Sequence, residues 1–239
     1  MAPILFVEGL KIRYRSAKER LPRLSSSSQP SSQVVFQYSL IQVEKGECLG
    51  IVGQTGCGKT TLLNALFQPR FPGEVSYRRA EILGRDRNSI PAHELYSRIS
   101  YLPQYAQNAF NPSLTAGNHF RHVQRSLQIV EENIWHAWME ELKLSPQVLE
   151  YFPYQLSGGM KQRLALLLGF LKRPALYILD EPSSGVDAVT MKIILDFLRR
   201  RKEEGVTFLM VSHDVGLVNN FSDRVLFLEE QLCAKQNPC

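Results

Sequence analysis

The sequence lacks any long apolar run, and its four cysteines include no CxxC pair. The longest apolar stretch, roughly residues 164–171, is far shorter than the ~20 residues that a membrane-spanning helix needs. The N-terminus also lacks the basic start and apolar core of a secretory signal. Four scattered cysteines argue against a disulfide framework and suit a reducing compartment. We therefore expect a chain with no membrane span of its own.

The net charge also gives no indication of nucleic-acid binding. The formal net charge is only +5 over 239 residues, and no basic stripe with interleaved aromatic residues is visible. We therefore predict no nucleic-acid partner. Basic residues gather between positions 11 and 23, where a solvated loop is favoured over a membrane or partner contact. The length suits one domain with two lobes.

One glycine-rich segment matches the P-loop pattern in full. GQTGCGKT at residues 53–60 has Gly, four residues and then Gly-Lys-Thr, between an apolar strand pattern and a helical pattern. Its glycines allow the backbone to wrap around phosphate oxygens. Lys59 is expected to reach the β- and γ-phosphates, and Thr60 to bind Mg²⁺. The predicted nucleotide-binding residues are Gly53, Gln54, Thr55, Gly56, Cys57, Gly58, Lys59, Thr60 and Thr61.

Two adjacent carboxylates follow a second apolar run, LYILDEP at residues 176–182. The run predicts a buried parallel strand that ends at the acidic pair. Asp180 is suited to coordinate Mg²⁺, and Glu181 to polarise the water that attacks the γ-phosphate. In isolation an ordinary acidic turn would be the better interpretation. The complete P-loop upstream favours the catalytic one.

A third segment, QLSGGMKQR at residues 155–163, places small residues before an apolar helical run. Ser157, Gly158 and Gly159 then form a helix N-terminus with free backbone N–H groups. Such an end attracts anions, because its unpaired donors and the helix dipole both point outward. The chain therefore has two phosphate-binding helix ends, although one nucleotide does not obviously need both.

Together these segments resemble the ATPase subunits of ATP-binding cassette (ABC) transporters, over almost the whole chain. Residues 53–61 are similar to the Walker A motif, residues 176–181 to Walker B and residues 156–163 to the family signature. LPQ at 102–104 is similar to the Q-loop, SSGVD at 183–187 to the D-loop, and SHD at 212–214 to the switch-histidine segment.

The resemblance implies a composite site between two cassettes packed head to tail. Ser157, Gly158 and Gly159 of one cassette would contact the γ-phosphate of the ATP held by the other. ATP and Mg²⁺ are the implied cofactors. ATP binding would close the dimer, and hydrolysis would reopen it.

The resemblance also assigns four single residues. Gln104 would contact Mg²⁺ and the attacking water, and His213 would bond the γ-phosphate; without the family, a satisfied histidine at a strand end would be preferred. Asp187 would cross the dimer interface, with a helix N-cap as an alternative that is compatible with it. Tyr14 would stack on adenine, although an edge-strand tyrosine is nearly as good an interpretation.

The predicted fold class is α/β, a P-loop NTPase (RecA-like) core with an antiparallel β lobe and an inserted helical lobe. The β lobe covers about 1–45 and 72–85, with candidate strands at 4–14, 34–43 and 74–82, and the helical lobe covers about 105–170. The remainder is the catalytic core, and residues 21–33 are predicted to be a flexible loop. The basic run at 199–202 is attributed to helix-dipole complementarity.

The segment QNAFNPSLTAGNHF at 107–120 is similar to ATPases of the peptide, nickel and metallophore uptake branch. The implied partners are a second ABC ATPase subunit, which in that branch is usually a different chain, two membrane permeases and an extracytoplasmic solute-binding protein. The implied location is the cytoplasmic face of the membrane. Phe110, Pro112 and Leu114 are the candidate permease-groove residues, with plain lobe packing as the alternative for Phe110.

The solute and the class of system remain open. The chain stops soon after its last strand, which shifts weight from peptides toward nickel, metallophore or phosphonate systems. A soluble non-transport ABC ATPase and a regulatory cassette with little catalysis are the competing interpretations.

Overall fold

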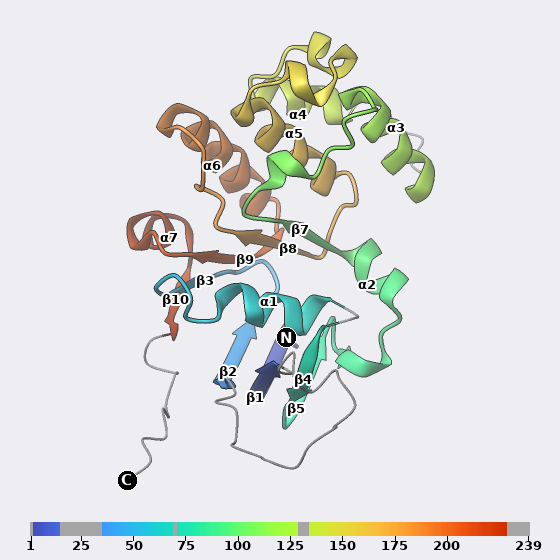
Figure 1. The fold of residues 1–239 in the computed structure, drawn as a ribbon. Helices are drawn as coiled ribbons and strands as arrows, with labels where there is room; N and C mark the ends of the chain where they lie inside the picture. The colour runs from blue at the N-terminus through green and yellow to red at the C-terminus, as the bar shows by residue number, and fades with distance from the viewer. Residues whose placement is uncertain (1, 15–34, 69–70, 129–133, 229–239) are drawn as a thin grey trace, which may run out of the picture.

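The computed structural model describes residues 2–14, 35–68, 71–128 and 134–228. The predicted flexible loop at 21–33 lies outside these residues. Two sheets and a group of helices make up the fold, with an antiparallel sheet at one end and a helical lobe at the other (Figure 1). The parallel sheet lies between them.

The antiparallel sheet has the order β2-β1-β5-β6, with β4 also paired to β1. One strand was expected at 74–82, but the structure has two. The reason lies in β1, where β5 pairs with Leu5–Glu8 and β4 pairs with Lys11–Tyr14. Gly9 separates the two pairings and has φ +65, a conformation that interrupts a regular strand. The strands are β1 (Leu5–Tyr14), β2 (Val35–Val43), β4 (Gly73–Ser76), β5 (Arg79–Ile82) and β6 (Arg85–Asp86).

The second sheet is parallel throughout, in the order β10-β3-β9-β8-β7. Every residue of β3, β8 and β9 is buried, as expected for a parallel sheet covered on both faces. The predicted α/β class with a P-loop core is confirmed. The strands are β3 (Cys48–Val52), β7 (Ile99–Leu102), β8 (Leu176–Asp180), β9 (Thr207–Ser212) and β10 (Arg224–Phe227).

Helices cover the two faces of the parallel sheet differently. Helix α1 (Lys59–Phe67) packs between the two sheets, where Leu49 and Ile51 of β3 face it. Helices α5 (Gly158–Phe170) and α6 (Ala188–Glu203) lie on the opposite face, in the cluster that contains Val52 (Figure 1). The two helices that begin at the P-loop and the signature segment therefore lie on opposite sides of one sheet.

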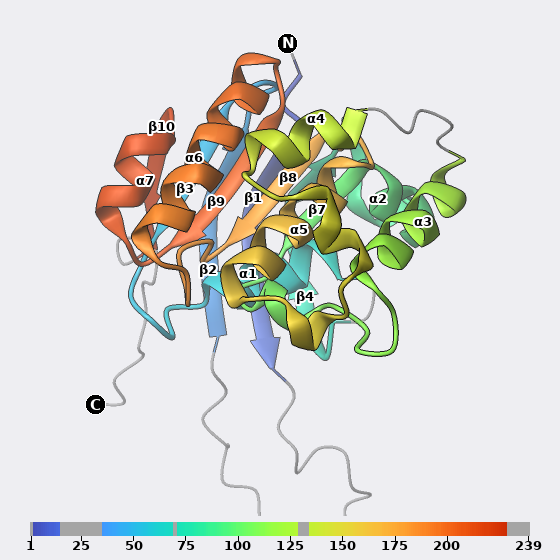
Figure 2. The ribbon, with the colours of Figure 1, turned by 90° about the horizontal axis from the view of Figure 1, so that it is seen from above.

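The helical lobe gathers around α5 (Figure 2). Phe110 is only 7% exposed and belongs to the core cluster, in an edge contact with His119. This favours lobe packing for Phe110, whereas Pro112 is exposed and Leu114 half-buried. None of the helices in the described residues is long and apolar enough to cross a membrane. The other helices are α2 (Ala92–Arg98), α3 (Ala116–Leu127), α4 (Ile134–Glu141) and α7 (Val215–Phe221).

The basic run at 199–202 is more than a dipole partner for its helix. Arg201 is 4% exposed and pairs with Glu141 of α4 at 3.3 Å. Its guanidinium also lies over the rings of Trp138 and Phe197. Arg201 thus ties α6 to the helical lobe, a contact between residues sixty positions apart that local charge pattern does not reveal.

Candidate active site

The P-loop connects β3 to α1 and holds its lysine inside the loop. Lys59 is 6% exposed, and its Nζ donates to the carbonyl oxygens of Gly53 at 2.6 Å and Gln54 at 3.0 Å. The same Nζ lies 3.3 Å from Oε1 of Glu181. The lysine therefore links the loop to the end of β8, and its charge is already balanced.

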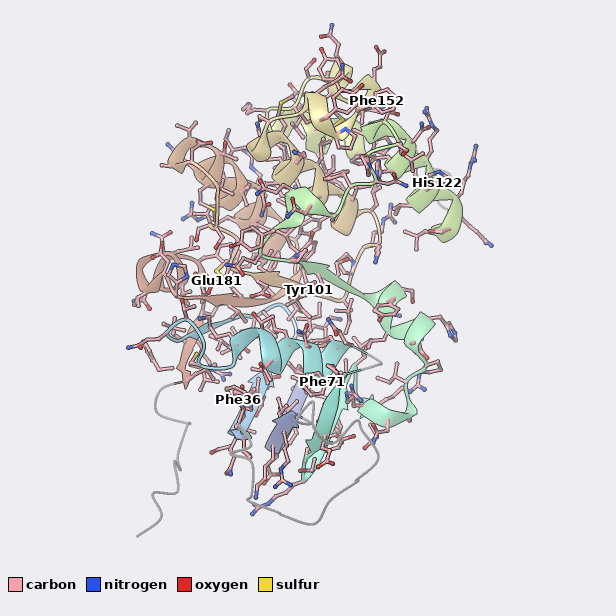
Figure 3. The ribbon with its side chains drawn as sticks, viewed as in Figure 1. Phe36, Phe71, Tyr101, His122, Phe152 and Glu181 are labelled. Carbon is pink, nitrogen blue, oxygen red and sulfur yellow. The ribbon has the colours of Figure 1, made fainter. Side chains whose placement is uncertain are left out.

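The last glycine of the loop is required by its surroundings. Gly58 has φ +101 and caps α1, and a Cβ there would lie 2.5 Å from the ring of Phe36. The hydroxyl of the buried Tyr38 donates to the Gly58 carbonyl at 3.0 Å. Strand β2 thus supports the P-loop from below, as the position of Phe36 in Figure 3 shows. Sequence reasoning missed both aromatic residues.

Asp180 ends β8 beside the P-loop threonine. Its Oδ2 accepts a hydrogen bond from the Tyr101 hydroxyl at 2.7 Å and lies 3.5 Å from Oγ1 of Thr60. Its Oδ1 is buried and has no hydrogen-bond partner within the described part of the chain. Burial raises the pKa of Asp180, and the hydrogen bond from Tyr101 opposes that shift. A buried oxygen without a partner is costly unless something else binds it.

These atoms fit a magnesium ion. A carboxylate oxygen without a partner and a nearby hydroxyl are the oxygen donors that Mg²⁺ takes alongside phosphate and water. Within the described residues no cluster of three or more His, Cys, Asp or Glu side chains offers a metal site elsewhere. The chemistry of the donors therefore agrees with a metal held jointly by protein and nucleotide.

Glu181 follows Asp180 and is fixed by several groups. Its Oε2 accepts hydrogen bonds from Ser212 Oγ at 3.1 Å and from the His213 backbone N–H at 3.2 Å. The His213 Nδ1 lies 2.7 Å from the same oxygen. Glu181 has φ +49, unusual for a residue with a side chain. Strained backbone at a buried acid is typical of a functional position. Figure 3 shows Glu181 and Tyr101 at the level of the parallel strands, between the two lobes.

The Q-loop and D-loop segments meet beside these carboxylates. Nε2 of Gln104 lies 3.4 Å from Oγ of Ser184. Asp187 caps α6, because its side chain accepts from the Thr190 backbone N–H and hydroxyl, each at 2.8 Å. The backbone bond from Thr190 is the main cause of a lowered pKa for Asp187. The N-cap role is thus present, and it leaves a further interface role open.

The signature segment begins α5 as expected. Ser157 is the N-cap and accepts a hydrogen bond from the Met160 N–H at 3.2 Å. A Cβ on Gly159 would lie 2.9 Å from Oγ1 of Thr190, so α5 and α6 approach closely at their N-termini. Arg163 donates to the carbonyls of Gly159 at 3.1 Å and Leu142 at 2.8 Å. This helix end is therefore held against both the helical lobe and the N-terminus of α6.

The remaining predicted residues are placed with less detail. Tyr14 is the last residue of β1, and its side chain is not among those described. Gln54, Thr55 and Gly56 are exposed, and Cys57 is half-buried with its Sγ against Gly53. The structure thus brings together the P-loop, both carboxylates, Gln104 and His213, while Ser157 lies on the helix of the opposite sheet face.

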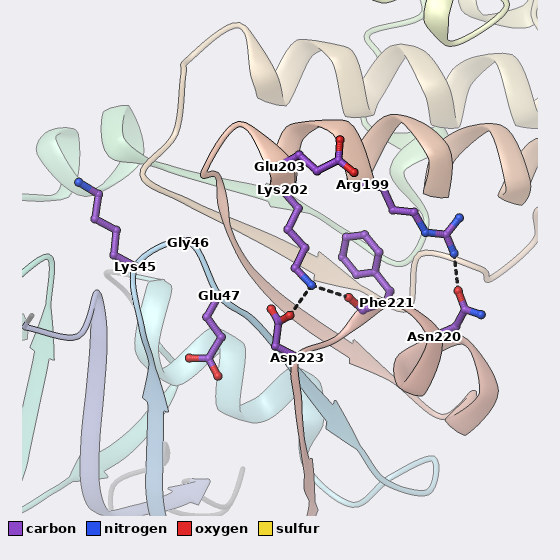
Figure 4. A pocket seen from close by; sticks show the side chains of 9 residues that line it. All are labelled: Lys45, Gly46, Glu47, Arg199, Lys202, Glu203, Asn220, Phe221 and Asp223. Atoms are coloured by element: carbon purple, nitrogen blue, oxygen red, sulfur yellow. Dashed lines mark hydrogen bonds and ion pairs between the residues drawn. The ribbon is translucent and has the colours of Figure 1, made fainter.

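A concave region of about 670 Å³ lies elsewhere, at the N-terminal ends of β3 and β10 (Figure 4). Lys202 pairs there with Asp223 at 2.7 Å, and Arg199 bonds Asn220. Ligands of parallel α/β sheets bind at the opposite, carboxyl ends of the strands. This region therefore plays no part in the candidate site.

Comparison with known proteins decides the family. The model of the ABC transporter family matches residues 37–184, more than half of the chain. The chain belongs to the ABC transporter family. The predicted resemblance to its ATPase subunits is therefore confirmed.

The curated relatives carry names from one branch of that family. The chain is 29% identical to the putative oligopeptide transport ATP-binding protein YkfD of Bacillus subtilis, over 93% of this chain and 66% of the relative. It is 30% identical to the oligopeptide transport ATP-binding protein OppF of Escherichia coli, over 79% of this chain and 58% of the relative. It is also 29% identical to the metal-staphylopine import system ATP-binding protein CntD of Staphylococcus aureus, over 77% of this chain and 72% of the relative. These names agree with the predicted peptide and metal uptake branch.

The match spans about 58 to 66% of the length of the first two relatives. Solved structures agree on the fold: the ATP-binding subunit of an ABC transporter superposes with a TM-score of 0.69 at 22% identity, covering 94% of this chain and 85% of that one. The dimeric post-hydrolysis state of the ATP-binding cassette MJ0796, bound to ADP and Pi, gives 0.69 at 21% identity and 93% coverage of both chains.

Proposed function

We propose that this chain is the ATP-hydrolysing subunit of an ABC importer. The observation that carries the proposal is the environment of Glu181. One carboxylate oxygen lies 3.3 Å from the P-loop lysine, and the other lies 2.7 Å from His213. A buried carboxylate between a phosphate-binding lysine and a histidine is placed to act where a γ-phosphate is attacked by water.

The steps follow from the contacts of each side chain. Lys59 exchanges the carbonyls of Gly53 and Gln54 for the β- and γ-phosphate oxygens when ATP enters. Glu181, released from that lysine, polarises the attacking water and accepts its proton, while the bond between the γ-phosphorus and the β–γ bridging oxygen breaks and ADP leaves. The backbone N–H of His213 keeps the carboxylate oriented, and its imidazole bonds the γ-phosphate. The fixed backbone at Glu181 limits reorganisation, which is how a preorganised site lowers a barrier.

Thr60, Asp180 and Gln104 are the residues that would hold Mg²⁺. When bound, the ion would neutralise charge on the phosphates. Asp180 contributes the buried Oδ1 that otherwise has no partner among the described residues, and Thr60 contributes a hydroxyl 3.5 Å from Oδ2.

The active unit is a head-to-tail dimer of cassettes. In this proposal Ser157, Gly158 and Gly159 complete the site of a partner rather than their own, which is supported by the position of α1 and α5 on opposite faces of the parallel sheet. Asp187, which caps α6 close to Gly159, would contribute to the same interface. A chain on its own would therefore hydrolyse ATP weakly.

The cargo is a peptide or a metal chelate, as the names of the relatives support. The remaining partners in this proposal are a second ABC ATPase, two permeases and an extracytoplasmic solute-binding protein, at the cytoplasmic side of a membrane. Tyr14 is the proposed adenine-stacking residue. Pro112 and Leu114 remain the candidates for the permease contact, because Phe110 is buried.

The test compares variants of the chain purified from membranes with its permeases. Glu181→Gln should abolish hydrolysis but retain ATP binding, whereas Glu140→Gln, an exposed glutamate on α4, should behave as wild type. Unchanged hydrolysis in Glu181→Gln would contradict the catalytic assignment. Mass spectrometry of the copurified subunits and solute tests the importer assignment and identifies the cargo. Recovery of the chain only as a monomer, with or without ATP, would count against the importer assignment.

A further inference from the structure

We propose that Tyr101 is a positioning residue for magnesium-bound ATP, through its hydrogen bond to Asp180. The hydroxyl donates to Oδ2 at 2.7 Å and so determines which carboxylate oxygen stays free to bind the ion. The oxygen left over is Oδ1, which is buried and lacks a hydrogen-bond partner within the described chain. The inference rests on the proposed magnesium site and adds a residue that the chain's recognised motifs do not contain.

The backbone explains why Tyr101 reaches this carboxylate. Strands β7 and β8 are parallel neighbours, and Tyr101 lies opposite Ile178, two residues before Asp180. Side chains of residues two apart on a strand point to the same side of the sheet. A long phenol side chain on β7 can therefore extend along the sheet to the carboxylate at the end of β8.

Packing alone does not account for the hydroxyl. Tyr101 is 40% exposed and lines an open, mainly apolar cavity of about 560 Å³ between α1, α2 and the sheet. Tyr96 lines the same cavity and is 51% exposed. Only Tyr101 of these two is bonded to Asp180. The ring is loosely covered, while its one polar atom is bound at 2.7 Å, which assigns the hydroxyl to Asp180 rather than to the core.

Without that hydroxyl, Asp180 would be held only by the more distant contact with Thr60, at 3.5 Å. The carboxylate could then rotate, and either oxygen could turn toward the ion. Removing the Tyr101 hydroxyl should therefore weaken only the part of the nucleotide affinity that depends on Mg²⁺. Contacts made by the P-loop backbone and Lys59 should be unaffected.

The experiment measures the affinity of the purified full chain for a fluorescent, non-hydrolysable ATP analogue, in EDTA and in excess Mg²⁺. Tyr101→Phe should leave the Kd in EDTA unchanged and reduce the gain from Mg²⁺ by about tenfold, since a hydrogen bond to a charged group is being removed. Tyr96→Phe is the matched control and should keep the full gain. In an Asp180→Asn background, Tyr101→Phe should have no further effect.

Equal gains from Mg²⁺ in wild type and Tyr101→Phe would overturn the inference. So would equal weakening with and without Mg²⁺, or an undiminished effect of Tyr101→Phe in the Asp180→Asn background. If the wild type itself gains nothing from Mg²⁺, the magnesium site of the proposed function fails, and the role of Tyr101 fails with it. Matching thermal unfolding midpoints for the two tyrosine variants would show that both are folded.

Discussion

His213 and Glu181 are joined twice, once through the backbone and once through the side chain. The His213 N–H donates to Oε2 of Glu181 at 3.2 Å, and its Nδ1 lies 2.7 Å from the same oxygen. The imidazole is nevertheless 55% exposed. One end of the ring is therefore fixed to the buried carboxylate, while the rest faces the solvent from which a nucleotide enters.

Replacing His213 with alanine should lower ATP hydrolysis by about a hundredfold, since removing one preorganised hydrogen-bonding group from a reacting site costs on that scale. ATP affinity should change little, because the P-loop holds the phosphates. The measurement is steady-state hydrolysis of the assembled complex together with equilibrium nucleotide binding. His93→Ala is the control, because His93 is exposed on α2. A similar loss of activity in both variants would contradict a specific role for His213.

The close approach of α5 and α6 predicts that one substitution destabilises the fold and that a second one compensates for it. In Gly159→Ala the new Cβ would lie 2.9 Å from Oγ1 and 3.2 Å from Cγ2 of Thr190. Overpacking of this kind costs about 1–3 kcal/mol. Thr190→Ala removes both atoms, so the double variant should recover stability relative to the sum of the single changes. Chemical denaturation of the four proteins measures this, and strict additivity would argue against the contact.

The parts of the site that the sequence predicts well are local. The P-loop, the carboxylate pair at the end of β8 and the Ser157 cap each depend on a short run of residues, whose spacing fixes both backbone and chemistry. Apolar runs likewise predicted β3 and β8. Short sequence patterns were therefore enough to predict the fold class and to propose most of the site residues.

The parts that the sequence could not predict depend on register or distance. The split of 74–82 into two strands follows from pairing across β1 on either side of Gly9. The bonds from Tyr101 to Asp180 and from Arg201 to Glu141 join residues 79 and 60 positions apart. Phe110 was a candidate for the permease groove because the surrounding segment is similar to the importers, but the fold buries it. Composition carries no information about any of these contacts.

Arg201 is expected to be one of the more costly basic residues to remove. Arg201→Ala breaks a buried pair with Glu141 and the contacts over two aromatic rings, and should lower the free energy of unfolding by about 3 kcal/mol. Arg200 pairs with the same glutamate at 3.3 Å, but its side chain is 58% exposed. Arg200→Ala should therefore cost less than about 1 kcal/mol. Equal costs, measured by urea denaturation, would contradict the burial argument.

The two described cysteines should differ in reactivity. Burial raises the pKa of Cys48 to about 12, so at pH 8 it remains a thiol, and only the thiolate reacts readily. Cys57 is half-buried in the P-loop, and bound ATP should cover it. Peptide-resolved alkylation should therefore modify Cys57 in the native protein, less so with ATP, and Cys48 only after unfolding. ATP-independent labelling of Cys57 would argue against nucleotide in this loop.

Asp223 should contribute stability that disappears in acid. Burial raises the pKa of Asp223, but the hydrogen bond from the Cys48 N–H at 2.8 Å and the ammonium of Lys202 outweigh this, so the pKa is lowered overall. A carboxyl whose pKa is lower in the folded protein stabilises the fold above its unfolded pKa of about 3.9, and this contribution is lost as the pH falls through the folded value. The gap in unfolding midpoint between wild type and Asp223→Asn should be full at pH 7 and shrink below about pH 4. A gap that stays constant with pH would show that the asparagine loses something other than the charge, because the ion pair with Lys202 exists only while Asp223 is ionised.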